Sequence, residues 1–131
     1  MVNVMQAAVA AAERVFEILE EPEQIADPTN PVTIENPQGK VVFKHISFRY
    51  VPDKPLIEDV SIDVEPGQLV AIVGPTGAGK TTLVNLLMRF YEVDSGTIYV
   101  DNTDIRTMTR KGLHSHIGMV LQDTWLFKGT I

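Results

Sequence analysis

The residues with the clearest chemical meaning form one stretch near the middle of the chain. They fit the pattern G-x-x-x-x-G-K-[ST] of a phosphate-binding loop: Gly74, Pro75, Thr76, Gly77, Ala78, Gly79, Lys80 and Thr81. Glycines at such positions let successive backbone N–H groups converge on phosphate oxygens without a Cβ in the way. Lys80 is then placed to reach the β- and γ-phosphates of a nucleotide, and the hydroxyl of Thr81 to coordinate Mg²⁺.

The elements on either side of this stretch support that interpretation. Leu69–Val73 is entirely apolar and rich in β-branched residues, which predicts a buried strand in a parallel sheet with helices on both faces. From Lys80 onward, Leu83, Leu86, Leu87 and Phe90 recur at i, i+3, i+4 and i+7, which predicts a helix. The pattern alone also fits a glycine-rich turn, but a strand before it and a helix after it favour phosphate binding.

The amino-terminal part of the chain differs in character from the rest. An amphipathic helix is expected over residues 4–20 because its apolar residues alternate at steps of three and four. Residues 22–39 contain four of the eight prolines, which predicts a linker. We therefore divide the chain into a helix at 1–21, a linker at 22–39 and an α/β domain at 40–131.

Beyond residue 40 the predicted elements are short. Strands are expected at Val41–Tyr50, Val60–Val64 and Thr97–Val100, where apolar and polar residues alternate. A turn is expected at Val51–Pro55. Arg110–Ile117 is predicted to be a short helix, and Gly118–Gln122 a final strand.

Composition excludes several classes of protein. The 131 residues are 44% hydrophobic with a net charge of −6, and neither half of the chain carries the basic patch that a nucleic-acid binder usually needs. The chain contains no cysteine, which excludes disulfides, thiolate metal sites and a cysteine nucleophile. No apolar run approaches the roughly 18 residues of a membrane helix. His114 and His116 would point to different faces of the predicted helix, so we expect no metal site there.

Beyond the loop, the sequence resembles the nucleotide-binding domains of ABC transporters of the exporter type, in which membrane domains are fused to the ATPase. The resemblance covers about Glu13 to Ile131. The stretch VFKHISFRY, ending at Tyr50, is similar to the family's first strand. LVNLLMRFYEVDSG and IGMVLQD resemble the segments after the phosphate loop and before the Q-loop, and LFKGTI resembles the next exporter segment.

This resemblance implies roles that spacing alone does not give. Tyr50 would stack on adenine, and Gln122 would sense Mg²⁺ and the γ-phosphate. Gln122 and Lys80 would be catalytic, Thr81 and Gln122 would hold the metal, and Thr82 would join the nucleotide-binding residues. The implied fold is α/β: a partial P-loop NTPase core with an antiparallel β layer, preceded by a helix and a linker.

The family also implies cofactors, partners and location. ATP and Mg²⁺ would be the ligands, and a second nucleotide-binding domain and membrane-spanning domains would be the partners. The domain would lie on the cytoplasmic face of a membrane. In the full-length parent, hydrolysis of ATP would drive export.

The sequence departs from the family because it stops before the LSGGQ signature, the second acidic motif and the switch histidine. We therefore expect this chain alone to bind ATP without hydrolysing it. We also expect it to self-associate through the open edge of the Leu69–Val73 strand. Two alternatives stay open: a nucleotide-binding or assembly module without hydrolysis, and a small P-loop kinase-type enzyme, which would need neither Tyr50 nor Gln122.

Overall fold

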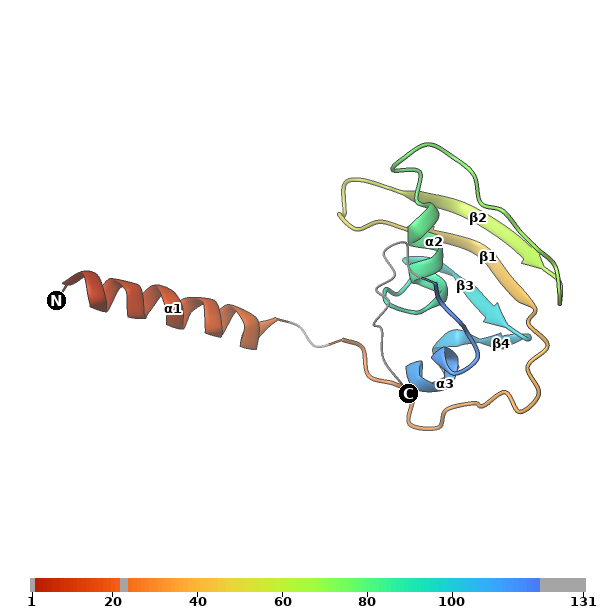
Figure 1. The fold of residues 1–131 in the computed structure, drawn as a ribbon, viewed down its shortest axis with the longest axis horizontal. Coiled ribbons are helices and arrows are strands. Elements are labelled where there is room, and N and C mark those ends of the chain that lie inside the picture. Colours follow the sequence, from red (N-terminus) through yellow and green to blue (C-terminus); the bar gives the residue numbers. More distant parts are fainter. Residues whose placement is uncertain (1, 22–23, 121–131) are drawn as a thin grey trace, which may run out of the picture.

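A long helix and an antiparallel sheet dominate the computed structural model, which describes residues 2–21 and 24–120 (Figure 1). Helix α1 spans Val2–Glu20. The described residues form a sheet in the order β2-β1-β3-β4, with every pair antiparallel. Its strands are β1 (Val41–Phe48), β2 (Ile57–Val64), β3 (Ser95–Val100) and β4 (Thr103–Asp104). The other elements are α2 (Lys80–Leu87), the 3₁₀ turn η1 (Ile105–Thr107) and α3 (Arg110–His114).

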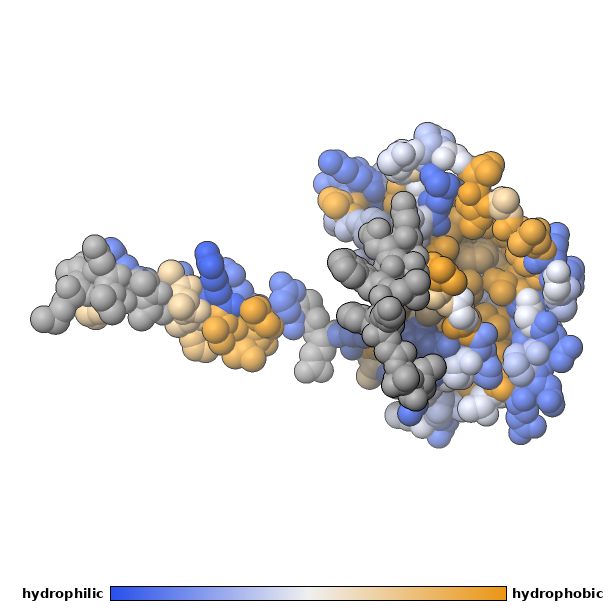
Figure 2. All heavy atoms as spheres, in the orientation of Figure 1, coloured by the Kyte–Doolittle hydropathy of each residue, from blue (hydrophilic) through white to orange (hydrophobic). Residues whose placement is uncertain are grey.

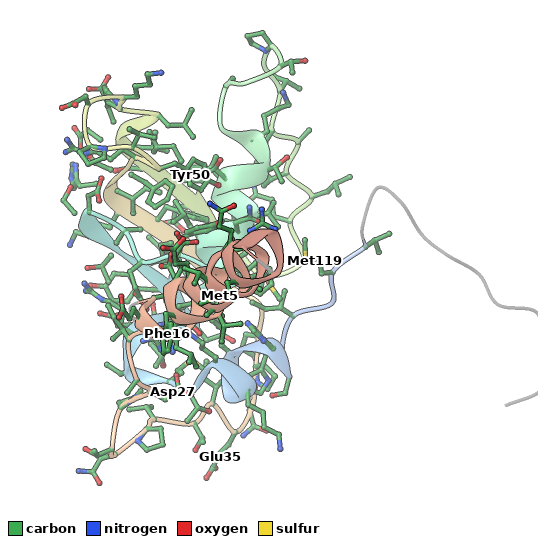
Figure 3. The ribbon with its side chains drawn as sticks, turned by 90° about the vertical axis from the view of Figure 1, so that its left-hand side faces the viewer. Met5, Phe16, Asp27, Glu35, Tyr50 and Met119 are labelled. Carbon is green, nitrogen blue, oxygen red and sulfur yellow. The ribbon has the colours of Figure 1, made fainter. Side chains whose placement is uncertain are left out.

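Helix α1 stands away from the sheet (Figure 1), and the helix expected over residues 4–20 is confirmed. Its apolar side chains lie open to solvent: Met5 is 70% exposed, Phe16 59% and Leu19 72%. Figure 3 labels Met5 and Phe16 on this helix. Residues 24–39, between this helix and the sheet, contain no helix or strand. In the described ranges, no helix combines the length and the apolar character needed to cross a bilayer.

The core forms where the sheet meets α2, η1 and α3 (Figure 1). Strands β1 and β3 supply its sheet side, and Leu86 of α2 and Leu113 of α3 are completely buried against them. The buried apolar residues of this core are Phe43, Ile46, Phe48, Ile57, Leu83, Leu86, Ile98, Val100, Ile105, Met108 and Leu113. Burial of side chains of this size stabilises the fold by roughly 1.5–3 kcal/mol each, so the core fixes α2 against the sheet.

A tight turn between β3 and β4 anchors the chain that enters β1. Asp101 and Asn102 both have positive φ, +47° and +63°, as a two-residue type I′ hairpin requires. The Asp101 carboxylate accepts hydrogen bonds from the backbone N–H groups of Gln38 and Lys40, both at 2.9 Å, and of Gly39 at 3.3 Å. Burial raises the pKa of Asp101, but these backbone donors lower it more, so that the pKa lies below its usual value.

Four charged side chains join the segment before β1 to the ends of α2 and α3. Arg89 is only 3% exposed; its Nε lies 2.8 Å from Oε1 of Glu92, and its Nη1 donates to the Met108 carbonyl at 2.9 Å. Arg110 lies 2.9 Å from Asp27 and 3.2 Å from the same Glu92 oxygen. We call Asp27, Arg89, Glu92 and Arg110 the arginine network.

The buried parallel strand predicted at Leu69–Val73 is not found. This segment carries no helix or strand, and Leu69 and Val73 are 97% and 87% exposed. A strand exists only by pairing its N–H and C=O groups with a neighbour, and no strand of the described residues runs beside this one. Val70 and Ile72 instead border an open apolar groove with β1, β2 and α2. Figure 2 shows apolar residues gathered in a hollow on this face.

Helix α2 ends at Leu87, so the prediction that Phe90 continues its apolar face is wrong. Arg89 adopts φ +55°, and its N–H donates to the carbonyl of Leu86 at 3.0 Å. The N–H of Phe90 donates to the carbonyl of Asn85, also at 3.0 Å. These two bonds form a Schellman motif, which reverses the chain and leaves Phe90 47% exposed.

The other predicted elements differ mainly in their ends. The antiparallel strands are confirmed, although β1 ends two residues before Tyr50 and β2 begins at Ile57. The turn after β1 is confirmed by a bridge between Val51 and Lys54. Helix α3 ends at His114 rather than Ile117. Residues 118–120 form no strand, and residues 121 and 122 of that predicted strand lie outside the described residues.

Candidate phosphate-binding site

Residues 74–79 form a turn that leads directly into α2. Gly77 and Gly79 have φ values of +85° and +83°, in the left-handed region where a Cβ would strain the backbone. The N–H of Ala78 donates to the carbonyl of Pro75 at 3.2 Å, which closes the turn on itself. The glycines of the pattern therefore shape the backbone at the start of the helix.

The side chain of Lys80 folds back over this turn. Its Nζ donates to the carbonyl oxygens of Gly74 and Pro75, each at 2.8 Å. An ammonium group is a compact charge with three donors. The same group can therefore keep contact with the loop while it meets an anion that the loop holds.

The amino-terminal end of α2 offers further donors. The first hydrogen bond within the helix runs from the Leu83 N–H to the Gly79 carbonyl at 3.0 Å, and no side chain caps the helix at Gly79. The N–H groups of Lys80, Thr81 and Thr82 therefore have no acceptor within the helix. With the partial positive charge of a helix amino terminus, they favour an anion.

The two threonines after Lys80 have different surroundings. Thr81 is exposed, so its hydroxyl is open to a cation that accompanies a bound phosphate. Thr82 is 6% exposed, and its Oγ1 accepts a hydrogen bond from the hydroxyl of Tyr50 at 3.3 Å.

This contact places Tyr50 beside the first turn of α2, although the two residues are 32 positions apart in sequence. Tyr50 is 48% exposed, which leaves ring surface for a ligand. The ring centroids of Phe48 and Tyr91 lie 4.8 and 5.0 Å from that of Tyr50, with the ring planes nearly perpendicular to it. Figure 3 shows Tyr50 at the side of the sheet that carries α2.

The structure thus brings Tyr50, Lys80, Thr81 and Thr82 together, whereas Gln122 lies outside the described residues. Sequence reasoning missed the aromatic contacts of Tyr50. The sequence pattern places Phe48 only in a strand, and Tyr91 follows Phe90 without any motif that links it to Tyr50. In the described part of the chain, His114 contacts the Met88 carbonyl at 2.7 Å, and no three His, Cys, Asp or Glu side chains gather as metal ligands.

A match to a protein-family model shows which family this chain belongs to. The family model described as ABC transporter matches residues 57–131, which is more than half of the chain and includes the loop and α2. The chain belongs to the ABC transporter family. The resemblance inferred from the sequence is thereby confirmed.

Curated relatives of this ABC transporter chain are much longer than the chain itself. A fatty acid ABC transporter ATP-binding/permease protein of Mycobacterium tuberculosis is 57% identical over 131 residues, covering 100% of this chain and 20% of the relative. An uncharacterized ABC transporter ATP-binding protein of Bacillus subtilis is 47% identical over 129 residues, covering 98% and 21%. The chain therefore spans about a fifth of the length of the curated relatives it matches.

A solved structure shows the same arrangement of elements. A bacterial Atm1-family ABC exporter with ATP bound superposes with a TM-score of 0.77 at 37% sequence identity. The match covers 95% of this chain and 22% of that one. The predicted fold class, a partial P-loop NTPase core with an antiparallel β layer, is confirmed.

Proposed function

We propose that this ABC transporter chain binds Mg-ATP at residues 74–82, as part of the ATP-binding domain of an exporter. The observation that carries the proposal is a loop whose carbonyls of Gly74 and Pro75 hold the Lys80 ammonium group and which leads into an α2 start with no side-chain cap. ATP is bound in the exporter structure that the chain resembles. The kinase-type alternative is not favoured by the family match.

Each residue has a role that its position supports. The backbone from Gly74 to Gly79 cradles the phosphates, and Lys80 neutralises the β- and γ-phosphate charge. Mg²⁺ keeps several waters and binds substrate phosphates through few protein ligands, so the exposed Thr81 hydroxyl suits it, with Gln122 as a second ligand. Tyr50 stacks on the base.

The surroundings of the domain follow from the same proposal. Residues 40–131 form the amino-terminal part of a nucleotide-binding domain, and residues 22–39 link it to the helix at 1–21. This helix joins the domain to membrane-spanning domains at the cytoplasmic face, and its exposed apolar residues support such a partner. Two nucleotide-binding domains pair in the parent, and ATP hydrolysis drives export.

We expect this chain alone to bind ATP without turning it over. Catalysis of phosphoryl transfer depends on positioning the attacking water and stabilising charge. The proposed roles of Lys80, Thr81 and Gln122 are to bind the phosphates and Mg²⁺, and none of these roles positions the water. A phosphate-release assay with Mg-ATP should give no more than the buffer rate. Steady release that Lys80→Ala abolishes would contradict this expectation.

Stacking on Tyr50 should account for the part of the ATP affinity that the adenine base contributes. Stacking on an aromatic ring is worth roughly 1–3 kcal/mol in nucleic-acid binders, so Tyr50→Ala should weaken ATP binding about 5- to 100-fold. Tyr50→Phe should have little effect, because the hydroxyl contact of 3.3 Å is long for an O–H···O bond. Titration calorimetry measures both, and equal affinities for the alanine and phenylalanine variants would exclude a stacking role.

The exposed Leu69–Val73 segment should make the chain associate with itself. Within the part of the chain that the structure describes, its backbone pairs with no strand. Its apolar side chains border an open groove, a combination that favours pairing between copies. Sedimentation across a concentration series should show a mass that rises with concentration, and Leu69→Lys should reduce that rise. A monomer of constant mass at the highest concentration would exclude this association.

A further inference from the structure

The three aromatic rings Phe48, Tyr50 and Tyr91 form one contact cluster beside α2. The centroids of Phe48 and Tyr91 lie 5.7 Å apart, and each lies within 5.0 Å of Tyr50. Phe48 is 5% exposed and belongs to the core, whereas Tyr50 and Tyr91 are 48% and 46% exposed. Tyr50 is therefore an exposed ring held between one buried and one exposed partner.

The geometry fixes the plane of the Tyr50 ring. The planes of Phe48 and Tyr91 make angles of 87° and 86° with it, the edge-to-face arrangement that aromatic quadrupoles favour. The hydroxyl contact to Thr82 locates the far end of the ring beside the first turn of α2. A stacking surface works only in an orientation that matches the plane of the base, so the neighbours that fix its plane affect binding.

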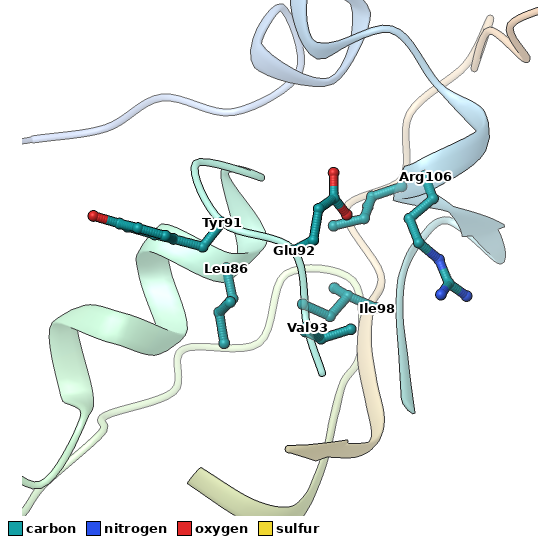
Figure 4. Close-up of a pocket in the computed structure, with 7 residues that line it drawn as sticks. Leu86, Tyr91, Glu92, Val93, Ile98 and Arg106 are labelled. Atoms are coloured by element: carbon teal, nitrogen blue, oxygen red, sulfur yellow. The ribbon is translucent and has the colours of Figure 1, made fainter. Parts of the chain in front are cut away.

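The ring of Tyr91 points in a different direction from the side chains of its neighbours in sequence. Figure 4 shows its ring turned away from Glu92 and Arg106, which lie on the other side of the small pocket beneath it. Phe90, one residue earlier, packs instead against His114 at a centroid distance of 5.7 Å. The Schellman turn after α2 thus sends two consecutive aromatic rings to different partners, and only Tyr91 contacts Tyr50.

We propose that Tyr91 is a positioning residue for the base of the nucleotide: it holds Tyr50 in the orientation that stacks on adenine. This inference rests on the proposed function of Tyr50 and adds a residue to it. Because Tyr91 follows α2, whose first turn carries the phosphate-binding N–H groups, it links the base platform and the phosphate loop through one short segment of chain.

The test compares two ligands that share the phosphate site. Mg-ATP engages both the loop and Tyr50, whereas inorganic Mg-tripolyphosphate engages only the loop. An edge-to-face pair is worth roughly 0.5–1.5 kcal/mol, so Tyr91→Ala and Tyr91→Leu should weaken ATP binding by about 2- to 12-fold and leave tripolyphosphate binding unchanged. Tyr91→Phe should restore ATP affinity, and Phe90→Ala serves as the matched control with no effect on either ligand.

A double-mutant cycle separates a positioning role from direct contact with the base. If Tyr91 acts through Tyr50, then adding Tyr91→Ala to Tyr50→Ala should weaken ATP binding no further. Additive losses, an equal loss of tripolyphosphate affinity, or unchanged ATP affinity in Tyr91→Ala would each overturn the proposal. A chain that binds neither ligand would instead overturn the proposed function itself, and the inference about Tyr91 with it.

Discussion

Replacing Arg89 by alanine should lower the free energy of unfolding by about 1–3 kcal/mol, because it leaves the buried Met108 carbonyl without its guanidinium donor. Arg89 is almost fully buried, and its guanidinium group donates hydrogen bonds to both the Glu92 carboxylate and the Met108 carbonyl. Without it, the Glu92 carboxylate would keep Arg110 as its one charged partner among the residues that the structure describes. Asp27 would also lose a charge 3.8 Å away.

Chemical denaturation monitored by circular dichroism measures this loss. Arg106→Ala is the matched control, because Arg106 pairs with Asp104 at the surface and its side chain is 46% exposed. Surface pairs contribute about 0–1 kcal/mol, so the control should lose little stability. Equal losses in the two variants would show that the arginine network does not stabilise the fold in the way its burial indicates.

The phosphate loop was predictable from sequence because its function depends on local geometry. The glycines, Lys80 and Thr81 are adjacent in the chain. The turn that the glycines form leads directly into α2, which begins at Lys80. The same holds for α1 and for the β-turn at Val51–Lys54, whose signals lie within a few residues. A local pattern was sufficient in each case.

The prediction at Leu69–Val73 failed because a strand is not a local structure. Apolar, β-branched composition indicates a segment suited to burial in a sheet, but the strand forms only when neighbouring strands pair with it. Among the described residues, the sheet ends at β2 and β4, and this segment stays outside it.

The arginine network and the contacts among Phe48, Tyr50 and Tyr91 could not be predicted from the sequence for a related reason. Arg89 is a charged residue in an apolar stretch, where it would normally be expected on the surface. Its burial depends on Asp27, which precedes it by more than sixty positions. Likewise, the contact of Tyr50 with Tyr91 appears only once the Schellman motif ends α2 and turns the chain.

Lys80→Ala should weaken Mg-ATP binding about 10- to 100-fold. A hydrogen bond to a charged group is worth roughly 1.5–3 kcal/mol, and 1.4 kcal/mol corresponds to a tenfold change in affinity. The variant also loses the two contacts of Nζ with the loop carbonyls. Because Lys80 is outside the apolar core, the fold itself should persist.

Lys111→Ala provides the control for charge, since it removes the same charge from an exposed position on α3. Both variants should keep the circular dichroism spectrum of the parent chain. Any difference in ATP affinity between them then reports the position of the charge rather than its loss.

Titration calorimetry of the chain with Mg-ATP, run in parallel on Lys80→Ala and Lys111→Ala, tests most directly whether residues 74–82 bind the phosphates of a nucleotide. We expect one ATP per chain, an affinity lowered about 10- to 100-fold in Lys80→Ala, and an unchanged affinity in Lys111→Ala. A folded Lys80→Ala chain that binds Mg-ATP as tightly as the parent would contradict the assignment of the loop.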